Sequence, residues 1–182
     1  MKRRWQLVFA TVIVASAVLG VYVGSTRREP LVDTAQLPET AITQFFAIRL
    51  NDSDGKMQPM SQWRGKTLVI NFWATWCPPC REEMPAFSRL QTKYAANGVQ
   101  FVGIALDTPD NVSAFLKKVT ATYPLLLAES EGMAMTQQLG NSRLALPYTL
   151  VLGADEKPRL VRLGKLAEQE LDGLLGEMTH LK

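Results

Sequence analysis

Two cysteines separated by two prolines, Cys77-Pro78-Pro79-Cys80, constrain this chain more than any other feature of its sequence. The pair follows residues 67–73, a run of β-branched and aromatic side chains without strict alternation, typical of a strand buried on both faces. It opens residues 80–97, where apolar side chains recur at helical spacing until Asn97-Gly98 ends the pattern. The sequence therefore predicts a buried strand, a tight turn that carries the cysteines, and a helix.

Segments typical of strands and of helices alternate along the rest of the chain. The first two predicted strands flank the turn cluster NDSDGK and form an N-terminal hairpin. The predicted strands are residues 45–50, 57–60, 67–73, 99–106, 124–128, 148–153 and 159–163, and the predicted helices are 80–97, 108–123, 131–139 and 167–181. This order predicts an α/β fold with a mostly parallel or mixed central sheet that helices cover on both faces.

The N-terminal segment predicts a membrane anchor. Residues 5–26 contain no charged side chain, and about 20 apolar or small residues in a helix span the hydrocarbon core of a bilayer. Three basic residues precede this segment, which keeps the N-terminus in the cytoplasm and exports the rest. A cleaved signal peptide is the alternative, because Ala15-Ser16-Ala17 matches a cleavage site. We expect a retained anchor at 1–26, a linker at 27–43 and one domain at 44–182.

Composition excludes several classes of function. The chain has one histidine, His180, which is too few for a His-based triad or a multi-histidine metal site. The formal net charge is +3, but residues 1–30 carry a surplus of four positive charges, so the remaining chain is slightly acidic. We therefore expect no nucleic-acid partner and no cofactor.

The position of the cysteine pair predicts its chemistry. A helix N-terminus stabilises anions, so we expect Cys77, at the exposed start of the helix, to have a lowered pKa and to be the attacking thiolate. Cys80, one turn further, is shielded and resolves the mixed disulfide that the attack forms. Trp76 is expected at the edge of this site, and Trp73 in the core.

Three other interpretations of the pair compete with exchange. A purely structural disulfide across so short a loop removes little entropy from the unfolded chain. A metal site could use the two thiolates for copper(I), with Met133 and Met135 as further sulfur ligands, although these methionines are more often packing residues. A peroxidase would need a peroxidatic cysteine in its own oxyanion pocket, and a paired cysteine after a tryptophan fits exchange better.

The stretch VINFWATWCPPCREEMP, together with Leu146-Pro147-Tyr148-Thr149 at the start of a strand, resembles the thioredoxin superfamily. Within it, the resemblance is to the membrane-anchored TlpA/ResA-like thiol:disulfide oxidoreductases and covers residues 44–182. It implies a thioredoxin-like fold with an N-terminal hairpin and an inserted β-α unit near residues 99–128. It also implies a cis-proline at Pro147 that faces the disulfide. The residues it places against the substrate are Trp76, Pro78, Pro79, Leu146 and Pro147.

Two departures from thioredoxin itself bear on the mechanism. Asn71 stands where thioredoxin has a buried aspartate, and an amide cannot shuttle a proton. The resemblance makes Glu83, one turn beyond Cys80, the candidate replacement and a catalytic residue; the alternative is an ordinary solvated helix carboxylate. The segment NSRLAL before Pro147 is longer than is usual in thioredoxin. The resemblance therefore does not determine the structure of the substrate-facing loop.

Together these observations predict a thiol:disulfide oxidoreductase of the cell envelope, a single-pass inner-membrane protein with its catalytic domain in the periplasm. Pro78 and Pro79 lack amide hydrogens that would stabilise the Cys77 thiolate, which favours a reductant over an oxidant. Expected partners are protein disulfides or dithiols, as in cytochrome c maturation, and a membrane thiol donor of electrons. We expect a monomer. A copper-handling module and a disulfide-introducing oxidase remain the alternatives.

Overall fold

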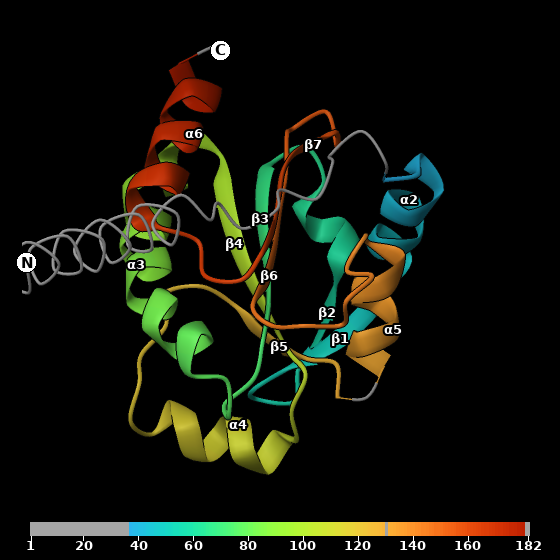
Figure 1. Cartoon of the computed structure of the whole chain (residues 1–182), viewed down its shortest axis with the longest axis vertical. Coiled ribbons are helices and arrows are strands. Elements are labelled where there is room, and N and C mark those ends of the chain that lie inside the picture. Colours follow the sequence, from blue (N-terminus) through green and yellow to red (C-terminus); the bar gives the residue numbers. More distant parts are fainter. Residues whose placement is uncertain (1–36, 130, 181–182) are drawn as a thin grey trace, which may run out of the picture. The chain divides into compact units, whose positions relative to one another are not determined.

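The structure is a computed structural model that describes residues 37–129 and 131–180. Its centre is a seven-stranded sheet in the order β2-β1-β5-β4-β3-β6-β7 (Figure 1). The strands are β1 (Arg49–Asp52), β2 (Met57–Pro59), β3 (Thr67–Trp73), β4 (Val99–Ala105), β5 (Leu125–Leu127), β6 (Tyr148–Leu152) and β7 (Pro158–Leu163). The helices are α2 (Glu39–Ala47), α3 (Pro78–Tyr94), α4 (Pro109–Leu116), α5 (Glu131–Gln138) and α6 (Glu168–His180), with short 3₁₀ turns η2 (Met60–Trp63) and η3 (Ala95–Asn97).

The sheet is mixed, as the sequence predicts. Strand β3 pairs in parallel with β4 and antiparallel with β6, and β4 pairs in parallel with β5. The outer pairs β1–β2, β1–β5 and β6–β7 are antiparallel. All residues of β3 are buried, which agrees with the continuous apolar run that predicts a central strand.

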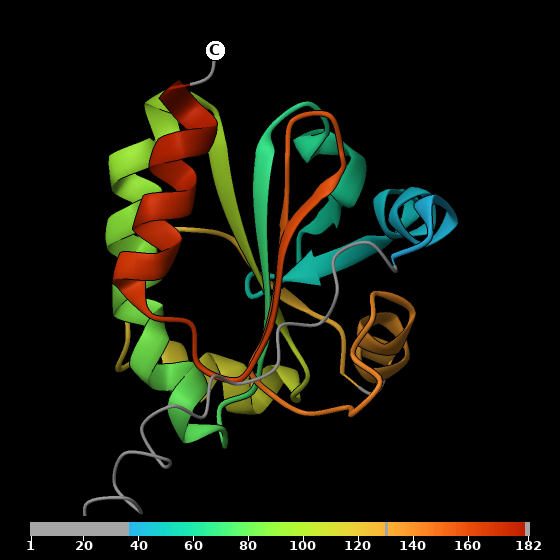
Figure 2. The same cartoon turned by 45° about the horizontal axis from the view of Figure 1, so that its top comes forward.

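Helices cover both faces of the sheet, and each face has its own apolar core (Figure 2). On the α2/α5 face, α2 and α5 pack on the inner side chains of β3, β4 and β6, including Leu68, Ile70 and Phe72. On the α3/α6 face, α3, α4 and α6 pack on the alternate side chains, including Val69 and Trp73. The alternation of β3 residues between two cores is the period of two expected of a strand.

The beginning of the domain differs from the sequence prediction. The sequence predicts a strand at residues 45–50 and a linker at 27–43, but α2 begins at Glu39 and continues to Ala47. The apolar residues of this segment are spaced for one face of a helix, which buries them in the α2/α5 core; they are Ala41, Ile42, Phe45 and Phe46. The packed domain therefore includes residues 39–43, and the predicted boundary at residue 44 is too late.

The N-terminal hairpin is confirmed in a shorter form, with Leu50 opposite Gln58. Residues 99–128, expected to contain the inserted unit, form β4, α4 and β5. The helix predicted to reach residue 123 ends at Leu116. Beyond it the chain crosses to α3, where Thr122 donates a hydrogen bond from its hydroxyl to the Ser88 carbonyl at 2.9 Å.

The anchor predicted at residues 1–26, the linker residues before 37 and the possible cleavage site lie outside the described residues. Between residues 37 and 180, apart from residue 130, no helix is both long and apolar enough to cross a membrane.

Candidate active site

The cysteine pair lies between the end of β3 and the first turn of α3. Cys77 is the extended N-cap residue of α3, and Pro78 and Pro79 occupy its first turn, where a proline's fixed φ suits the helix. A disulfide joins Cys77 to Cys80, with Cα atoms 5.4 Å apart. The strand, turn and helix predicted around the motif are therefore confirmed, with the helix starting at Pro78 rather than residue 80.

The residues of the motif differ in how far they are buried. Trp76 is 64% exposed and Trp73 is fully buried, as predicted for a site-edge and a core aromatic. Pro78 is exposed and Pro79 half-buried. Cys80 is fully shielded, but Cys77 is only 4% exposed, so the expectation of an exposed helix start is wrong for this side chain. Cys77 packs in the α3/α6 core, and only a small part of the residue faces solvent.

One carboxylate fixes the turn that leads from β3 to the cysteines. Asp107 accepts hydrogen bonds from the Thr75 backbone N–H at 3.0 Å and from the Thr75 hydroxyl. Its other oxygen accepts from the Thr108 N–H at 2.8 Å and from Asn111 Nδ2 at 2.7 Å. Burial alone would raise the pKa of Asp107, but these hydrogen bonds outweigh it and hold the pKa below its usual range. Asp107 was not predicted from the sequence, where its only local signal is its place just before the Thr108 helix cap.

Glu83 is buried beneath the disulfide-bearing turn of α3, with 1% of its surface exposed. Its Oε1 accepts a hydrogen bond from Asn71 Nδ2 at 2.8 Å, and its Oε2 accepts one from the Leu166 N–H at 3.1 Å. Burial raises the pKa of Glu83 to about 7, although the hydrogen bonds from Leu166 and Asn71 pull it the other way. The alternative of a solvated helix carboxylate is wrong, and Glu83 has the pKa of an acid–base group near neutral pH.

More buried polar atoms lie on the same face of the sheet as this carboxylate. Asn71 Oδ1, Trp73 Nε1 and the Tyr123 hydroxyl have no hydrogen-bond partner within the described part of the chain. The side chains of Trp73 and Tyr123 both lie beside Gly103, the β4 residue paired with Asn71: a Cβ there would lie 3.2 Å from Trp73 Nε1 and 3.3 Å from Tyr123 Cε2. Burial and the charge of Glu83 both raise the pKa of Tyr123. Tyr123 comes from the loop before β5, and nothing in its local sequence marks it as a neighbour of Glu83.

The segment before β6 reaches the same end of the sheet as the cysteines. Tyr148, the first residue of β6, pairs with Phe72 near the end of β3, so the residues before Tyr148 and after Trp73 leave the sheet together. The Leu146–Pro147 peptide bond is cis, which confirms the expectation for Pro147. Leu146 packs against the core cluster that contains both cysteines. The structure therefore brings the predicted substrate-contacting residues to one end of the sheet.

The methionines considered as copper ligands lie elsewhere. Met133 and Met135 belong to α5 and pack in the α2/α5 core, whereas the cysteines pack in the α3/α6 core across the sheet. They do not supply sulfur to the cysteine pair, and packing is their role. Within residues 37–129 and 131–180 no cluster of three or more His, Cys, Asp or Glu side chains is arranged to hold a metal ion.

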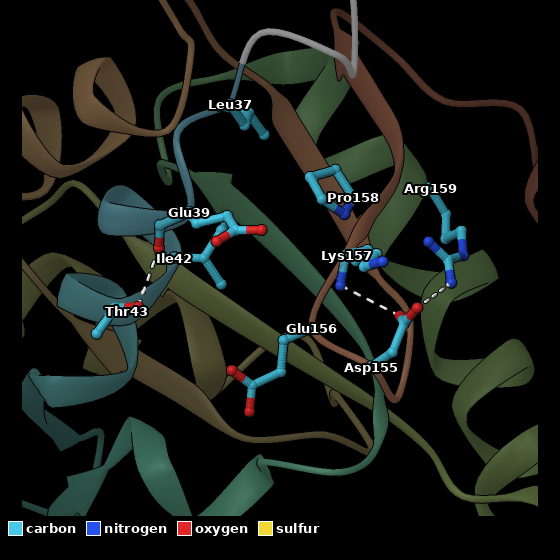
Figure 3. Close-up of a pocket in the computed structure, with 9 residues that line it drawn as sticks. All are labelled: Leu37, Glu39, Ile42, Thr43, Asp155, Glu156, Lys157, Pro158 and Arg159. Carbon is cyan, nitrogen blue, oxygen red and sulfur yellow. Dashed lines mark hydrogen bonds and ion pairs between the residues drawn. The ribbon is translucent and has the colours of Figure 1, made fainter.

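A pocket of about 560 Å³ lies at the far end of the sheet, between the start of α2 and the β6–β7 turn (Figure 3). Its charged residues are partly paired with one another, since Arg159 Nη2 bonds Asp155 Oδ2 at 2.7 Å (Figure 3). Strand β6 runs away from the cysteine end toward this turn. The pocket is therefore separate from the cysteine site.

Comparisons with known proteins agree with this geometry. The Redoxin family model matches residues 35–174. The chain is 29% identical over 131 residues to "Thiol-disulfide oxidoreductase ResA" of Bacillus cereus, covering 71% of this chain and 73% of that protein. It is 31% identical over 129 residues to "Thioredoxin-like protein YneN" of Bacillus subtilis, covering 68% and 71%. The structure of a thioredoxin-related protein from Neisseria meningitidis serogroup B superposes with a TM-score of 0.64 at 32% identity, covering 73% and 99%.

Proposed function

This chain belongs to the Redoxin family and is a thioredoxin-like thiol:disulfide oxidoreductase, and from that premise we propose that it reduces disulfides in exported proteins. The observation that carries the proposal is the Cys77–Cys80 disulfide at the start of α3, with the buried carboxyl group of Glu83 one turn beyond it. This pair is the electron carrier, and its partners are protein disulfides and dithiols.

The proposed cycle begins from the reduced protein. The Cys77 thiolate attacks one sulfur of the partner disulfide, forming a mixed disulfide and releasing the partner's other sulfur as a thiolate that takes up a proton. Cys80 then loses its proton and attacks Cys77 Sγ, which closes the Cys77–Cys80 bond and releases the second partner sulfur as a thiolate. Two electrons pass to the partner, and its two thiolates take up protons from solvent, which balance the protons that Cys77 and Cys80 lose. Glu83, with a pKa of about 7, is the buried group able to accept the Cys80 proton at neutral pH.

Three features of the site favour a reductant. Pro78 and Pro79 lack amide hydrogens, so among positions 78–80 only the Cys80 N–H can stabilise the Cys77 thiolate. Cys77 is buried among apolar side chains, which disfavours the thiolate further. A negative charge on Glu83 also disfavours a second negative charge on the Cys77 sulfur. A less stable thiolate makes the disulfide harder to reduce, and the dithiol correspondingly more reducing.

The place of this activity rests on the N-terminal sequence. An uncharged segment at residues 5–26 after three basic residues supports an inner-membrane anchor that exports the domain to the periplasm. An oxidising compartment requires that the protein be recharged, which supports a membrane thiol donor as its source of electrons. The resemblance to the TlpA/ResA-like branch supports the haem-site cysteines of apocytochrome c as one candidate substrate.

Equilibration with a glutathione buffer series tests the direction of electron flow. We expect a midpoint potential near the roughly −270 mV of thioredoxin. A midpoint above about −180 mV would favour the disulfide-introducing oxidase instead.

Two further experiments test the substrates and the anchor. Trapping partners on Cys80→Ala, whose mixed disulfides cannot resolve, identifies the substrates. N-terminal sequencing of the native protein tests the anchor. A mature terminus at Val18 would exclude an anchor.

A further inference from the structure

Strand β6 places a buried polar side chain against Asn71, the hydrogen-bond partner of Glu83. Thr149 of β6 lies directly opposite Asn71 of β3 in the antiparallel pair, and it is fully buried. Asn71 Nδ2 donates to Thr149 Oγ1 at 3.0 Å and to Glu83 Oε1 at 2.8 Å. One amide group therefore links the hydroxyl of Thr149 to the carboxyl group of Glu83.

The amide of Asn71 has partners at only one of its two ends. Its nitrogen donates one hydrogen to Glu83 and the other to Thr149, whereas its Oδ1 is buried and has no partner within the described part of the chain. Buried polar atoms are normally paired, and an unpaired one lowers stability. The two hydrogen bonds at the nitrogen thus hold the amide in an orientation that leaves its oxygen unpaired.

This orientation bears on the charge of Glu83. An amide nitrogen that donates to the carboxyl group stabilises the ionised form. An amide turned by 180° would instead present Oδ1, which accepts a hydrogen bond from the O–H of a protonated carboxyl group. Turning the amide breaks its bond to Thr149 as well as its bond to Glu83, so the hydroxyl of Thr149 opposes this rotation.

We propose that Thr149 is a positioning residue for Glu83, because its hydroxyl oxygen holds the Asn71 amide with the nitrogen toward the carboxylate. The inference rests on the proposed function, in which Glu83 accepts the Cys80 proton, and it adds the residue that keeps Glu83 ready for that step. Thr149 acts through Asn71 and takes no part in the proton transfer itself.

Other charged or titratable groups lie near this hydrogen-bond chain. They are Lys165 with its ion-pair partner Glu82, Arg162 with its ion-pair partner Glu170, Tyr123 and the two cysteines. Lys165 favours the ionised form of Glu83, and burial raises the pKa of Tyr123, which keeps its hydroxyl neutral near pH 7. The cysteines do not titrate in the oxidised protein. All these groups are unchanged when Thr149 is replaced, so a shift in the titration of Glu83 reports the hydrogen-bond chain.

The direct test is a carbon-13 NMR titration of the Glu83 carboxyl group in the oxidised protein, with Glu83→Gln identifying its resonance. Thr149→Val keeps the branched shape and removes the hydroxyl. It should raise the pKa of Glu83 from its value of about 7 by about half a pH unit, which is about a threefold higher proton affinity. Thr149→Ser keeps the hydroxyl, so its titration should match that of wild type.

Thr136→Val is the matched control. It also removes a fully buried threonine hydroxyl, which donates to the Met133 carbonyl at 2.9 Å within α5. This variant should lose stability and leave the titration of Glu83 unchanged, because the hydroxyl lies outside the chain from Thr149 to Glu83. An unshifted titration in Thr149→Val overturns the inference, as does an equal shift in Thr136→Val or in Thr149→Ser.

Reaction of the reduced protein with Ellman's reagent gives a kinetic readout. The first thionitrobenzoate leaves when Cys77 attacks the reagent, and the second leaves when the Cys80 thiolate attacks Cys77 Sγ and closes the disulfide. At pH 7 the second release should be about twofold slower in Thr149→Val, because less of Glu83 is ionised, and the difference should vanish above about pH 9. Equal slowing at every pH would indicate a merely structural effect and contradict the inference. A midpoint potential in the range of a disulfide-introducing oxidase contradicts only the reductase, because neither readout depends on the direction of electron flow.

Discussion

The two faces of the central sheet differ in whether their buried polar side chains have hydrogen-bond partners. On the α2/α5 face, the Tyr148 hydroxyl donates to the Leu139 carbonyl at 2.5 Å, and Asn141 uses both ends of its amide. On the α3/α6 face lie the buried carboxyl group of Glu83 and every unpartnered buried side-chain atom found between residues 37 and 180: Asn71 Oδ1, Trp73 Nε1, Tyr123 OH and Arg162 Nε.

This difference indicates that one face of the sheet mainly stabilises the fold, whereas the other also supports the chemistry of the cysteines. An unpaired buried polar group lowers stability and needs an explanation in a native protein. Here such groups gather on the face that contains the cysteines, where protons and electrons move, and the opposite face is an ordinary satisfied core. Substitutions on the α2/α5 face should therefore change stability alone, and those on the α3/α6 face should change chemistry, or even improve stability.

The largest expected effect is at Cys77. Cys77→Ala should reduce exchange to the uncatalysed background because the attacking sulfur is gone, while the reduced variant melts close to the reduced wild type. Cys80→Ala is the matched control: it should attack once and accumulate the mixed disulfide. Brief iodoacetamide treatment of the reduced protein should label Cys77, since Cys80 is fully shielded. Preferential labelling of Cys80 would reverse the assigned roles.

On the opposite face, Phe45→Ala should lower the free energy of unfolding by about 3–5 kcal/mol, because it empties a fully packed site in the α2/α5 core. The sheet separates this site from the disulfide, so the midpoint potential should stay the same. Denaturant unfolding and glutathione equilibration of the same variant measure both quantities. A shift of the potential by more than about 30 mV would show that the two faces are energetically coupled.

Glu83 should make stability depend on pH. Below about pH 4.5 this carboxyl is protonated in both states, whereas between 4.5 and its folded pKa of about 7 only the folded state keeps the proton. The stability that the protonated carboxyl confers on the folded state is therefore lost progressively as the pH rises from about 4.5 through 7, by about 3 kcal/mol in total. Glu83→Gln should remove this decline and change the pH dependence of exchange.

The measurement is urea unfolding of the oxidised protein from pH 5 to 8, in which neither cysteine titrates. Subtracting the variant from wild type isolates Glu83 from groups common to both, including the nearby Lys165 and Tyr123. Parallel stability curves and an unchanged exchange profile would leave Glu83 without an acid–base role.

The smallest expected effect is that of replacing a buried tyrosine by phenylalanine. It tests the comparison most directly, because the same replacement should change the free energy of unfolding in opposite directions on the two faces. Tyr148→Phe removes a hydroxyl that is hydrogen-bonded, and should destabilise by about 1 kcal/mol. Tyr123→Phe removes an unpartnered buried hydroxyl, and should stabilise by about 1 kcal/mol. Thermal or urea unfolding compares the pair. Equal destabilisation by both would mean that the Tyr123 hydroxyl has a partner in solution.

Where sequence and structure agree, the signal was local. The apolar run of β3, the two prolines and the helical spacing after Cys80 are contiguous, so the strand–turn–helix unit could be predicted before any tertiary contact was known. Pro147 was identified as a cis-proline only through a resemblance, because proline bonds in folded proteins are overwhelmingly trans.

Other features depend on distant residues. Residues 45–50 contain residues with high strand propensity, but the spacing from Ala41 to Phe46 matches a helix, and packing in the α2/α5 core decided between them. The burial of Glu83 depends on Asn71 in β3 and on the Leu166 amide before α6, and no local pattern predicts either contact. Tyr123 and Asp107 were missed for the same reason.

The Asp107 clamp bears on the speed of the reaction. Hydrogen bonds from Thr75 and from the start of α4 tie the turn before Cys77 to one carboxylate. We expect a turn fastened in this way to stay in place when a partner arrives. Exchange should accordingly have a small reorganisation barrier, with the approach of the partner and the ionisation of the thiols setting its rate.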